Sequence, residues 1–331
     1  LHPDRRFRAA LTLAVHAPHA DQWQPADFDF MANHLIDASL DHQMVHQRSF
    51  LRPVRNRLLP CLEKLAADEQ LPETQRLRAT NALADLGADD PRLLARVLIE
   101  ATSSEFSVLF SALGSREGDW LRQMAAEQPT QDLSPAARVD LGTRRAGAAI
   151  ARILQGDHQD ALSVLQVRDD PESLTQFVHS SRSRGLFPAD VLACLRLADQ
   201  VRQQQPHAER ATHDRAVSGL LLTLGQYPLQ ELPGDARAPL IDDLERWYRE
   251  DPSAAMHGAA GWLLREWGLH QIADRCDQIE IPYSADREWF TIKVAGGIPR
   301  ANSPPQSAAT MCFTFVVFPA GEYEIGSRED E

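Results

Sequence analysis

Histidine pairs are the first candidates for chemistry in this chain of 331 residues. His16 and His19, and likewise His42 and His46, have spacings that place two imidazole groups on one face of a helix. A zinc site needs a third ligand, and a metalloprotease also needs a general-base glutamate in the HExxH pattern. The stretch His42-Gln-Met-Val-His46 lacks that glutamate. We therefore predict no metal site at either pair.

The cysteines do not form a recognisable reactive or metal-binding group. They stand far apart and never as CxxC, at Cys61, Cys194, Cys276 and Cys312. Such spacing argues against a disulfide framework or a zinc cluster and favours buried thiols. The helical region also lacks a glycine-rich phosphate loop, a GxGxxG motif and a GxSxG motif. The sequence thus predicts no catalytic, cofactor-binding or metal-binding residue in this segment.

The charge balance excludes further classes of function. The net charge is -13, and only Lys64 and Lys293 among 34 basic residues are lysine. We attribute this arginine preference first to coding bias and second to arginine-specific recognition. An acidic chain lacks the basic face that nucleic acid requires, and no run of about 18 apolar residues could span a membrane. We expect protein partners, no nucleic acid and no direct membrane contact by this segment.

A recurring helical stripe organises most of the chain. Apolar residues fall at positions i, i+3, i+4 and i+7, which is the pattern of one buried helix face. The last four copies are closely followed by a glycine (Gly87, Gly156, Gly225 and Gly268), for which we predict left-handed helix C-caps. The five stripes are Phe7, Ala10, Leu11, Ala14; Ala79, Ala82, Leu83, Leu86; Ala146, Ala149, Ile150, Ile153; Val217, Leu220, Leu221, Leu224; and Met256, Ala259, Ala260, Leu263.

An acidic residue followed by proline marks three expected helix starts. Asp90-Pro91, Asp170-Pro171 and Asp251-Pro252 are separated by 80 and 81 residues. Aspartate suits the N-cap, and proline suits the first helical position. Ser134-Pro135 is expected to start a further helix in the same way. A period near 80 corresponds to two units of about 40 residues, the length of a two-helix solenoid repeat. The fold predicted is mostly α, an α-solenoid of antiparallel helix pairs.

The periodicity changes after residue 278. Residues 289–294 alternate as a strand does, a loop follows at 296–307, and the run 312–318 is apolar and rich in β-formers. We expect a returning strand at 322–326. The aromatic residues Trp247, Tyr248, Trp262 and Trp267 are expected to pack the last helix pair against this short β-containing segment.

The helical pattern is similar to that of HEAT repeats. The resemblance rests on Pro60-Cys-Leu62-Glu-Lys-Leu65, Asp68, Arg78-Ala79, Ala82-Leu83 and Leu86-Gly87, and it covers roughly residues 1–275. It implies a stack of antiparallel helix pairs that binds other proteins or braces a neighbouring domain and carries no catalytic residues. We assign residues 1–278 to this HEAT-like domain.

The stretch Phe315–Glu331 resembles the opening of the formylglycine-generating enzyme (sulfatase-modifying factor) family. Pro319-Ala-Gly-Glu-Tyr323, Gly326-Ser327 and Glu329-Asp-Glu331 carry this resemblance. It implies oxidation of a protein or small-molecule side chain with molecular oxygen, a cysteine pair and copper, with calcium in a structural role. Those cysteines belong to the family's C-terminal part, so Cys312 receives no catalytic role. We assign 279–312 to a linker with a β-strand and 313–331 to a truncated domain start.

The combination resembles large planctomycete-type bacterial proteins, in which a serine/threonine kinase that uses ATP and magnesium often precedes such repeats. We therefore expect a fragment of a larger bacterial protein, cytoplasmic or extracytoplasmic. The leading hypothesis is a non-catalytic scaffold for protein–protein interaction or interdomain support, attached to a formylglycine-generating-enzyme-like domain. Two alternatives stay open: a sensor or docking arm of the kinase, and a stand-alone adaptor.

Overall fold

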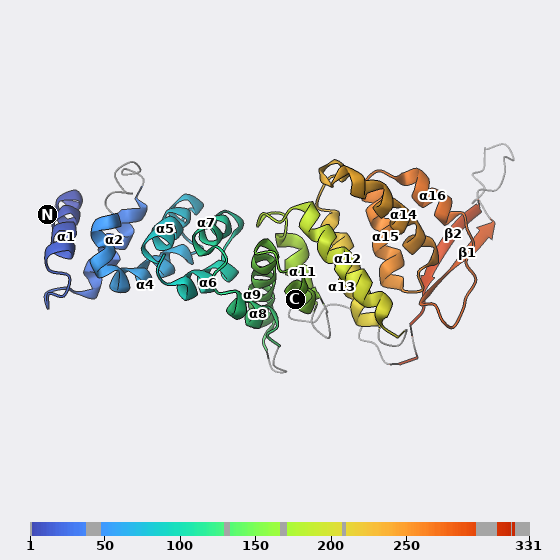
Figure 1. Cartoon of the computed structure of the whole chain (residues 1–331), viewed down its shortest axis with the longest axis horizontal. Helices are drawn as coiled ribbons and strands as arrows, with labels where there is room; N and C mark the ends of the chain where they lie inside the picture. The colour runs from blue at the N-terminus through green and yellow to red at the C-terminus, as the bar shows by residue number, and fades with distance from the viewer. Residues whose placement is uncertain are drawn as a thin grey trace, which may run out of the picture. The chain divides into compact units, whose positions relative to one another are not determined.

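The computed structural model describes residues 2–37, 48–128, 133–165, 171–206, 210–295, 310–318 and 320–321. The chain is mostly α-helical and carries a small antiparallel sheet near its C-terminus, which confirms the predicted fold class (Figure 1). It divides into two compact units, Leu1–Ala198 and Asp199–Glu331. Each unit has its own buried core.

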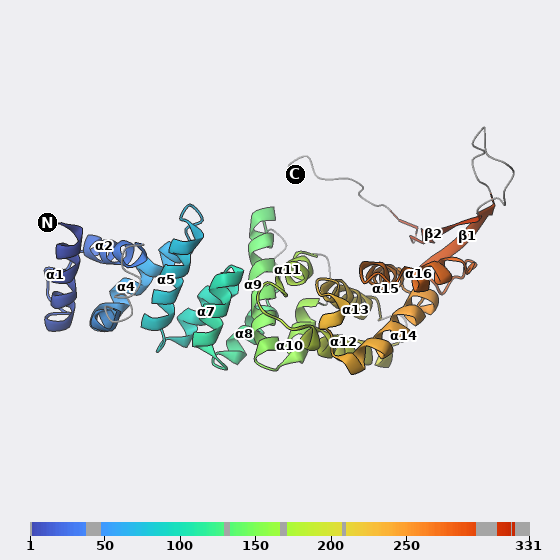
Figure 2. The same ribbon diagram turned by 90° about the horizontal axis from the view of Figure 1, so that it is seen from above.

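The first unit is a succession of helices that pack in pairs and against helices of the next pair (Figure 2). Helix α4 contacts α5, α6 contacts α7, and α8 contacts α9, while α5–α7 and α9–α11 contacts connect successive pairs. The elements are α1 (Pro3–His16), α2 (Pro25–Ile36), the 3-10 turn η2 (Arg52–Val54), α4 (Arg55–Ala66), α5 (Glu73–Leu86), α6 (Pro91–Glu100), α7 (Ser103–Leu113), α8 (Gly118–Ala125), α9 (Pro135–Leu154), α10 (His158–Leu165) and α11 (Glu172–Ser180).

The second unit combines packed helices with a two-stranded ribbon. Helix α12 (Pro188–Gln204) contains the boundary between the units. Helix α15 contacts α13, α14 and α16. The strands pair antiparallel, with Trp289 opposite Val316 and Thr291 opposite Thr314. The elements are α13 (Arg210–Leu224), the 3-10 turn η4 (Leu229–Glu231), α14 (Gly234–Glu250), α15 (Ala254–Glu266), α16 (His270–Asp277), β1 (Trp289–Ala295) and β2 (Thr310–Val316).

The five apolar stripes form the helix–helix contacts, as predicted. All of their residues are buried except Ala10, which is half-buried. Because alanine and glycine occupy many of these positions, neighbouring helices can approach closely. A Cβ added at Gly147 in α9, for example, would meet the carbonyl oxygen of Ile99 and lie 2.9 Å from the Ile99 Cα. The backbone of α9 thus packs directly on the end of α6.

Two predicted helix starts are confirmed in detail. Asp90 accepts a hydrogen bond from the Leu93 amide at 3.0 Å, ahead of Pro91. Ser134 accepts one from the Ala137 amide at 3.3 Å, ahead of Pro135. In both cases a side-chain oxygen satisfies an amide that has no partner within the helix.

The third predicted start, Asp251-Pro252, is wrong. Helix α15 begins at Ala254 with Ser253 as its N-cap residue, while Asp251 follows the end of α14. The Asp251 carboxylate accepts a hydrogen bond from the Ser253 amide at 3.0 Å and also binds Arg202. The Asp251 carboxylate, which the local sequence pattern assigned to a helix N-cap, therefore pairs with Arg202 from another helix.

The glycine prediction is half correct. Gly156 and Gly268 have φ of 93° and 73°, as left-handed C-caps require. Gly87 has φ of -90°, and Gly225 does not have a positive φ. Gly225 is a glycine for a different reason, because a Cβ at this position would collide with the indole ring of Trp262.

Helix α8 lies within the short polar stretch 114–135, where the sequence has no apolar stripe. It buries only Leu121 and Ala125.

Several predictions lie outside the described residues. These are the His42/His46 pair, the Asp170 N-cap, the 296–307 loop, the returning strand at 322–326, and most of the residues that carry the formylglycine-generating enzyme resemblance.

We predict opposite effects of adding one methyl group at two helical glycines. Gly147→Ala is expected to cost about 1–3 kcal/mol of unfolding free energy, because the Cβ collides with backbone atoms of Ile99. Gly258→Ala, where nothing lies within 4 Å of the added Cβ, is expected to stabilise α15 by about 0.5–1 kcal/mol. Urea titrations of both variants measure the two signs. Equal effects at the two sites would contradict the close α6–α9 approach.

The buried stripe of α13 gives a second prediction. Leu221→Asp places an unpaired charge at a fully buried position and is expected to destabilise the protein by several kcal/mol, about 3–5. The adjacent Leu222 is only half-buried, so Leu222→Asp should cost clearly less. Thermal unfolding that is unchanged in Leu221→Asp would show that the helix register is wrong.

Candidate functional site

A buried arginine network lies at the centre of the second unit. The Arg202 guanidinium, on α12, donates from Nε to Asp214 on α13 and from Nη2 to Asp251 Oδ2 at 2.6 Å. A third carboxylate, Asp199, lies 3.6 Å from Nη1. The side chains of Arg202, Asp214 and Asp251 are each less than 10% exposed. One planar guanidinium therefore ties α12, α13 and the α14–α15 turn together.

The network contains more negative than positive charge. Burial by itself would lower the pKa of Arg202, but the hydrogen bonds and charges of Asp214 and Asp251 outweigh it and raise that pKa. Burial raises the pKa of Asp214 and of Asp199, against the lowering effect of Arg202. Asp199 Oδ1 also has no hydrogen-bond partner. Asp214 and Asp251 hold the guanidinium, whereas Asp199 has a hydrogen bond at one oxygen only, where Oδ2 accepts from the Gln203 side-chain amide at 2.6 Å.

The β1–β2 ribbon is bound to the α14–α15 turn next to this network. Trp289 is 1% exposed, and its indole Nε1 donates to the Asp251 carbonyl oxygen at 2.8 Å. The Glu288 amide donates to the Pro252 carbonyl at 2.9 Å, and the Glu288 side chain accepts from the Ala254 amide at 2.9 Å. We call the contact made by residues 287–289 with residues 248–257 the ribbon junction.

A stack of three rings fills the ribbon junction. The His257 imidazole lies 3.6 Å from the Trp289 ring and 4.5 Å from the Tyr248 ring, centroid to centroid. His257 Nδ1 lies 2.7 Å from the Tyr248 carbonyl oxygen, and burial lowers the pKa of His257. The ring is therefore neutral at pH 7 and donates its Nδ1 proton to that carbonyl. With both ring faces covered, His257 serves packing.

A second polar cluster supports Tyr248. Its hydroxyl donates to Asp277, and Arg265 Nη2 donates to the other Asp277 oxygen at 2.6 Å. Burial, followed by the hydrogen bond to Asp277, raises the pKa of Tyr248 to about 12. The phenol thus stays protonated. Its hydrogen bond to Asp277 joins α14 to α16, and Arg265 joins α15 to the same carboxylate. This explains one of the four aromatic residues singled out in the sequence. Of the other three, Trp247 is buried, Trp267 donates to the Tyr227 carbonyl at 2.9 Å, and Trp262 covers Gly225.

The cysteines lie in surroundings that suppress reactivity. Burial raises the pKa of Cys61 to about 11 and that of Cys194 to about 12, and it also raises the pKa of Cys276. Cys276 and Cys312 both line a small hollow of about 20 Å³ beneath the ribbon, which is room for about one water molecule. The thiols of Cys61, Cys194 and Cys276 therefore stay protonated at neutral pH, and a thiol is a poor nucleophile compared with its thiolate.

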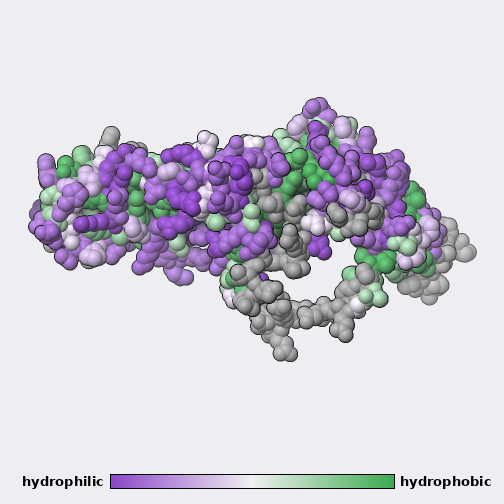
Figure 3. Space-filling model, turned by 60° about the horizontal axis from the view of Figure 1, so that its bottom comes forward, coloured by the Kyte–Doolittle hydropathy of each residue, from purple (hydrophilic) through white to green (hydrophobic). Residues whose placement is uncertain are grey.

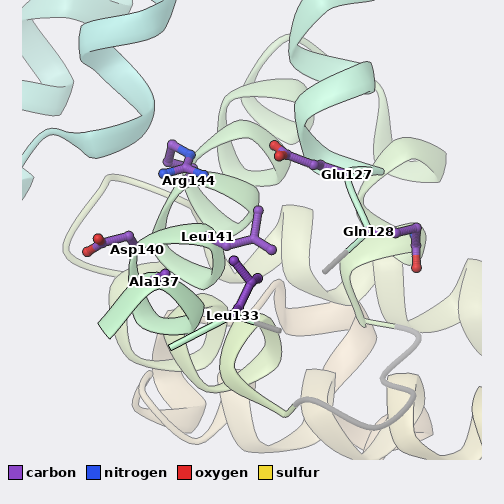
Figure 4. Close-up of a pocket in the computed structure, with 7 residues that line it drawn as sticks. All are labelled: Glu127, Gln128, Leu133, Ala137, Asp140, Leu141 and Arg144. Carbon is purple, nitrogen blue, oxygen red and sulfur yellow. The ribbon is translucent and has the colours of Figure 1, made fainter. Parts of the chain in front are cut away.

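Two surface hollows lie in the first unit. One, of about 150 Å³, has Leu133 and Leu141 at its centre and Glu127, Asp140 and Arg144 around them (Figure 4). The other is larger, about 370 Å³, and more polar. Here the Arg92 guanidinium lies 4.4 Å above the Trp120 ring and donates to Glu117 at 3.2 Å. Neither hollow brings a nucleophile and a general base together.

The first of the two histidine pairs lies at the surface. His16 is the last residue of α1 and His19 lies in the following turn, both exposed. Within the described part of the chain, no three His, Cys, Asp or Glu side chains converge as metal ligands do. None of the helices described there is long and apolar enough to cross a bilayer.

Comparison of the chain with protein-family models, curated proteins and solved structures found no match. Sequence reasoning also missed the main polar group of the second unit. Arg202, Asp214 and Asp251 are separated by 12 and 37 residues, and no local pattern links them. The one available signal was the spacing of Asp199 and Arg202 in the helix Pro188–Gln204, because residues three apart lie on the same helix face and can form an ion pair.

The arginine network predicts that its carboxylates have opposite effects on stability. Asp214→Ala leaves Arg202 with a missing buried partner and is expected to cost about 3–5 kcal/mol. Asp199→Asn is expected to stabilise the protein at pH 7, because burial disfavours this carboxylate when ionised. The raised pKa of Asp199 in the folded state lowers the stability of the wild type only at pH values above the pKa of the unfolded chain. The stability gained by Asp199→Asn should therefore vanish below about pH 4. Urea titrations at both pH values test this, and a loss of stability in Asp199→Asn at pH 7 would contradict it.

Proposed function

We propose that residues 1–278 act as a non-catalytic helical scaffold for protein–protein interaction and interdomain support, and that they carry the β1–β2 ribbon as the beginning of a C-terminal domain. The ribbon junction is the observation that supports this most directly. A flexible linker would leave the strands free of the helices, whereas residues 287–289 bind both ends of the α14–α15 turn.

The charges of the junction complement the two helix ends. Arg287 donates to the carbonyl oxygens of Glu250 and Asp251 at 3.1 and 3.2 Å, where α14 ends. Glu288 accepts from the Ala254 amide, where α15 begins. A cation at a helix C-terminus and an anion at an N-terminus are both favourable, because unpaired carbonyls and amides concentrate there. Adjacent residues of opposite sign therefore fix the direction in which the ribbon leaves the helices.

The finer form of the proposal concerns what the ribbon belongs to. In this proposal it begins a domain similar to the formylglycine-generating enzyme family, and any copper, calcium or oxygen chemistry belongs to that domain. The helical scaffold then contributes position and partner contacts, for which the Arg92–Trp120 hollow is a suitable surface in the first unit.

The junction gives a direct test. Trp289→Ala removes the ring that fills it, and the ribbon is expected to lose several kcal/mol of local stability, about 3–5. Hydrogen exchange measured by mass spectrometry should show faster exchange in β1 and β2, with α13 unchanged. Ile292→Ala is the matched control, because Ile292 is 41% exposed on the face of β1 opposite Trp289 and its loss should leave the junction intact.

Two outcomes would count against the proposal. If Trp289→Ala leaves hydrogen exchange in β1 and β2 unchanged, the ribbon junction does not hold the ribbon against the helices. Turnover of a substrate by residues 1–331 alone, lost on changing one side chain, would contradict the non-catalytic role.

A further inference from the structure

Among the described residues, the backbone groups on the outer edge of β2 have no strand partner. The Val317 amide donates to the Glu288 carbonyl at 2.7 Å, which fixes the alternation of the β1–β2 ladder. Phe313 and Phe315 then face β1 with their backbone groups, and Cys312, Thr314 and Val316 face away from it. The opposite edge of β1 is in use, because the Thr291 amide donates to the Ile281 carbonyl at 2.8 Å. Within the described chain, β2 pairs only with β1.

The outer face of the ribbon is apolar as well as exposed. Ile292 and Val294 of β1 are 41% and 45% exposed, and Phe313 and Phe315 of β2 are 44% and 45% exposed. The rings of Phe290 and Phe315 stack at 5.3 Å across the strands. Figure 3 shows hydrophobic side chains at the surface at this end of the second unit. An exposed apolar strand with a free edge is a template for pairing with another strand.

We propose that the occupant of this edge is β2 of a second copy of the chain, paired antiparallel about a two-fold axis at Thr314. In this register Thr314 lies opposite the partner's Thr314, and Cys312 lies opposite the partner's Val316. Phe313 lies opposite the partner's Phe315 on the apolar face. The outward amides and carbonyls of the strand then all find partners, and two ribbons become one four-stranded sheet.

Charge and side-chain type both favour a second copy. The chain carries a net charge of -13, which opposes contact between copies over most of the surface, whereas residues 310–318 contain no charged side chain. Opposing residues are also alike in kind across the axis: threonine with threonine, phenylalanine with phenylalanine, and cysteine with valine. Aromatic and β-branched cross-strand pairs of this type stabilise sheets. This pairing uses the edge that the returning strand expected at 322–326 would otherwise take, so a second copy competes with that strand. It does not rest on the junction or on the scaffold function.

Sedimentation velocity of the 331-residue chain, over about 1–100 µM, tests the pairing. We expect a concentration-dependent dimer. Thr314→Pro removes the outward amide and leaves the bonds to β1 in place, because proline is tolerated where an edge-strand amide faces solvent. It should weaken dimerisation at least about tenfold. Thr314→Val keeps the amide and is the matched control, expected to dimerise as the wild type does.

Two further variants keep the test decisive. Phe313→Lys leaves the backbone unchanged and puts a charge on the apolar face, so it should also weaken the dimer if Thr314→Pro disturbs the ribbon. Thr314→Cys in a Cys312→Ser background should give a disulfide-linked dimer with oxidised glutathione, because Cα atoms in a hydrogen-bonded antiparallel pair lie about 5.5 Å apart. Cys312→Ser alone should give none.

A monomer throughout the concentration range would overturn the proposal. If the amides of residues 312, 314 and 316 were then protected from hydrogen exchange in that monomer, another part of the same polypeptide would occupy the outer edge of β2. A dimer that persists unchanged in both Thr314→Pro and Phe313→Lys would also overturn it. Neither result bears on the ribbon junction, which the exchange of Trp289→Ala reports separately.

Discussion

The structure depends on one constraint: a single helix pair cannot bury its apolar face by itself. Each stripe, such as Ala79, Ala82, Leu83 and Leu86 in α5, becomes buried only when the next helix covers it. Small residues set how close that helix can come, and the contact of Gly147 with the end of α6 is an example. The stacking of successive pairs, and with it the position of every loop and hollow, follows from this requirement.

Close packing of helices creates a second problem, because helix ends carry carbonyl groups without partners. Two buried arginines solve it in the first unit. Arg145 donates to the Ala125 carbonyl at the end of α8, and Arg184 donates to the Ala101 carbonyl after α6. Burial lowers the pKa of Arg184 to about 10, yet it stays charged at neutral pH. Lysine has no planar group of five donors, so the arginine preference of this sequence has a structural use whatever its origin.

The ribbon shows how a short β segment can be held by a helical protein. Its inner face contributes Trp289 to the helices, and the charges of Arg287 and Glu288 meet the ends of α14 and α15. Among the described residues, the side chains on its outer face remain exposed.

The sequence alone determined the helical fold, the five buried stripes, two helix starts and both strands. These depend on residues close in sequence, through a period of 3.6 for helices and 2 for strands. Tertiary structure decided the roles of single polar residues. Asp251 has the local pattern of a helix N-cap but binds Arg202, 49 residues earlier, and Gly225 makes room for Trp262. A charged group that is buried takes the partner that is nearest in space, and no spacing in the sequence specifies that partner.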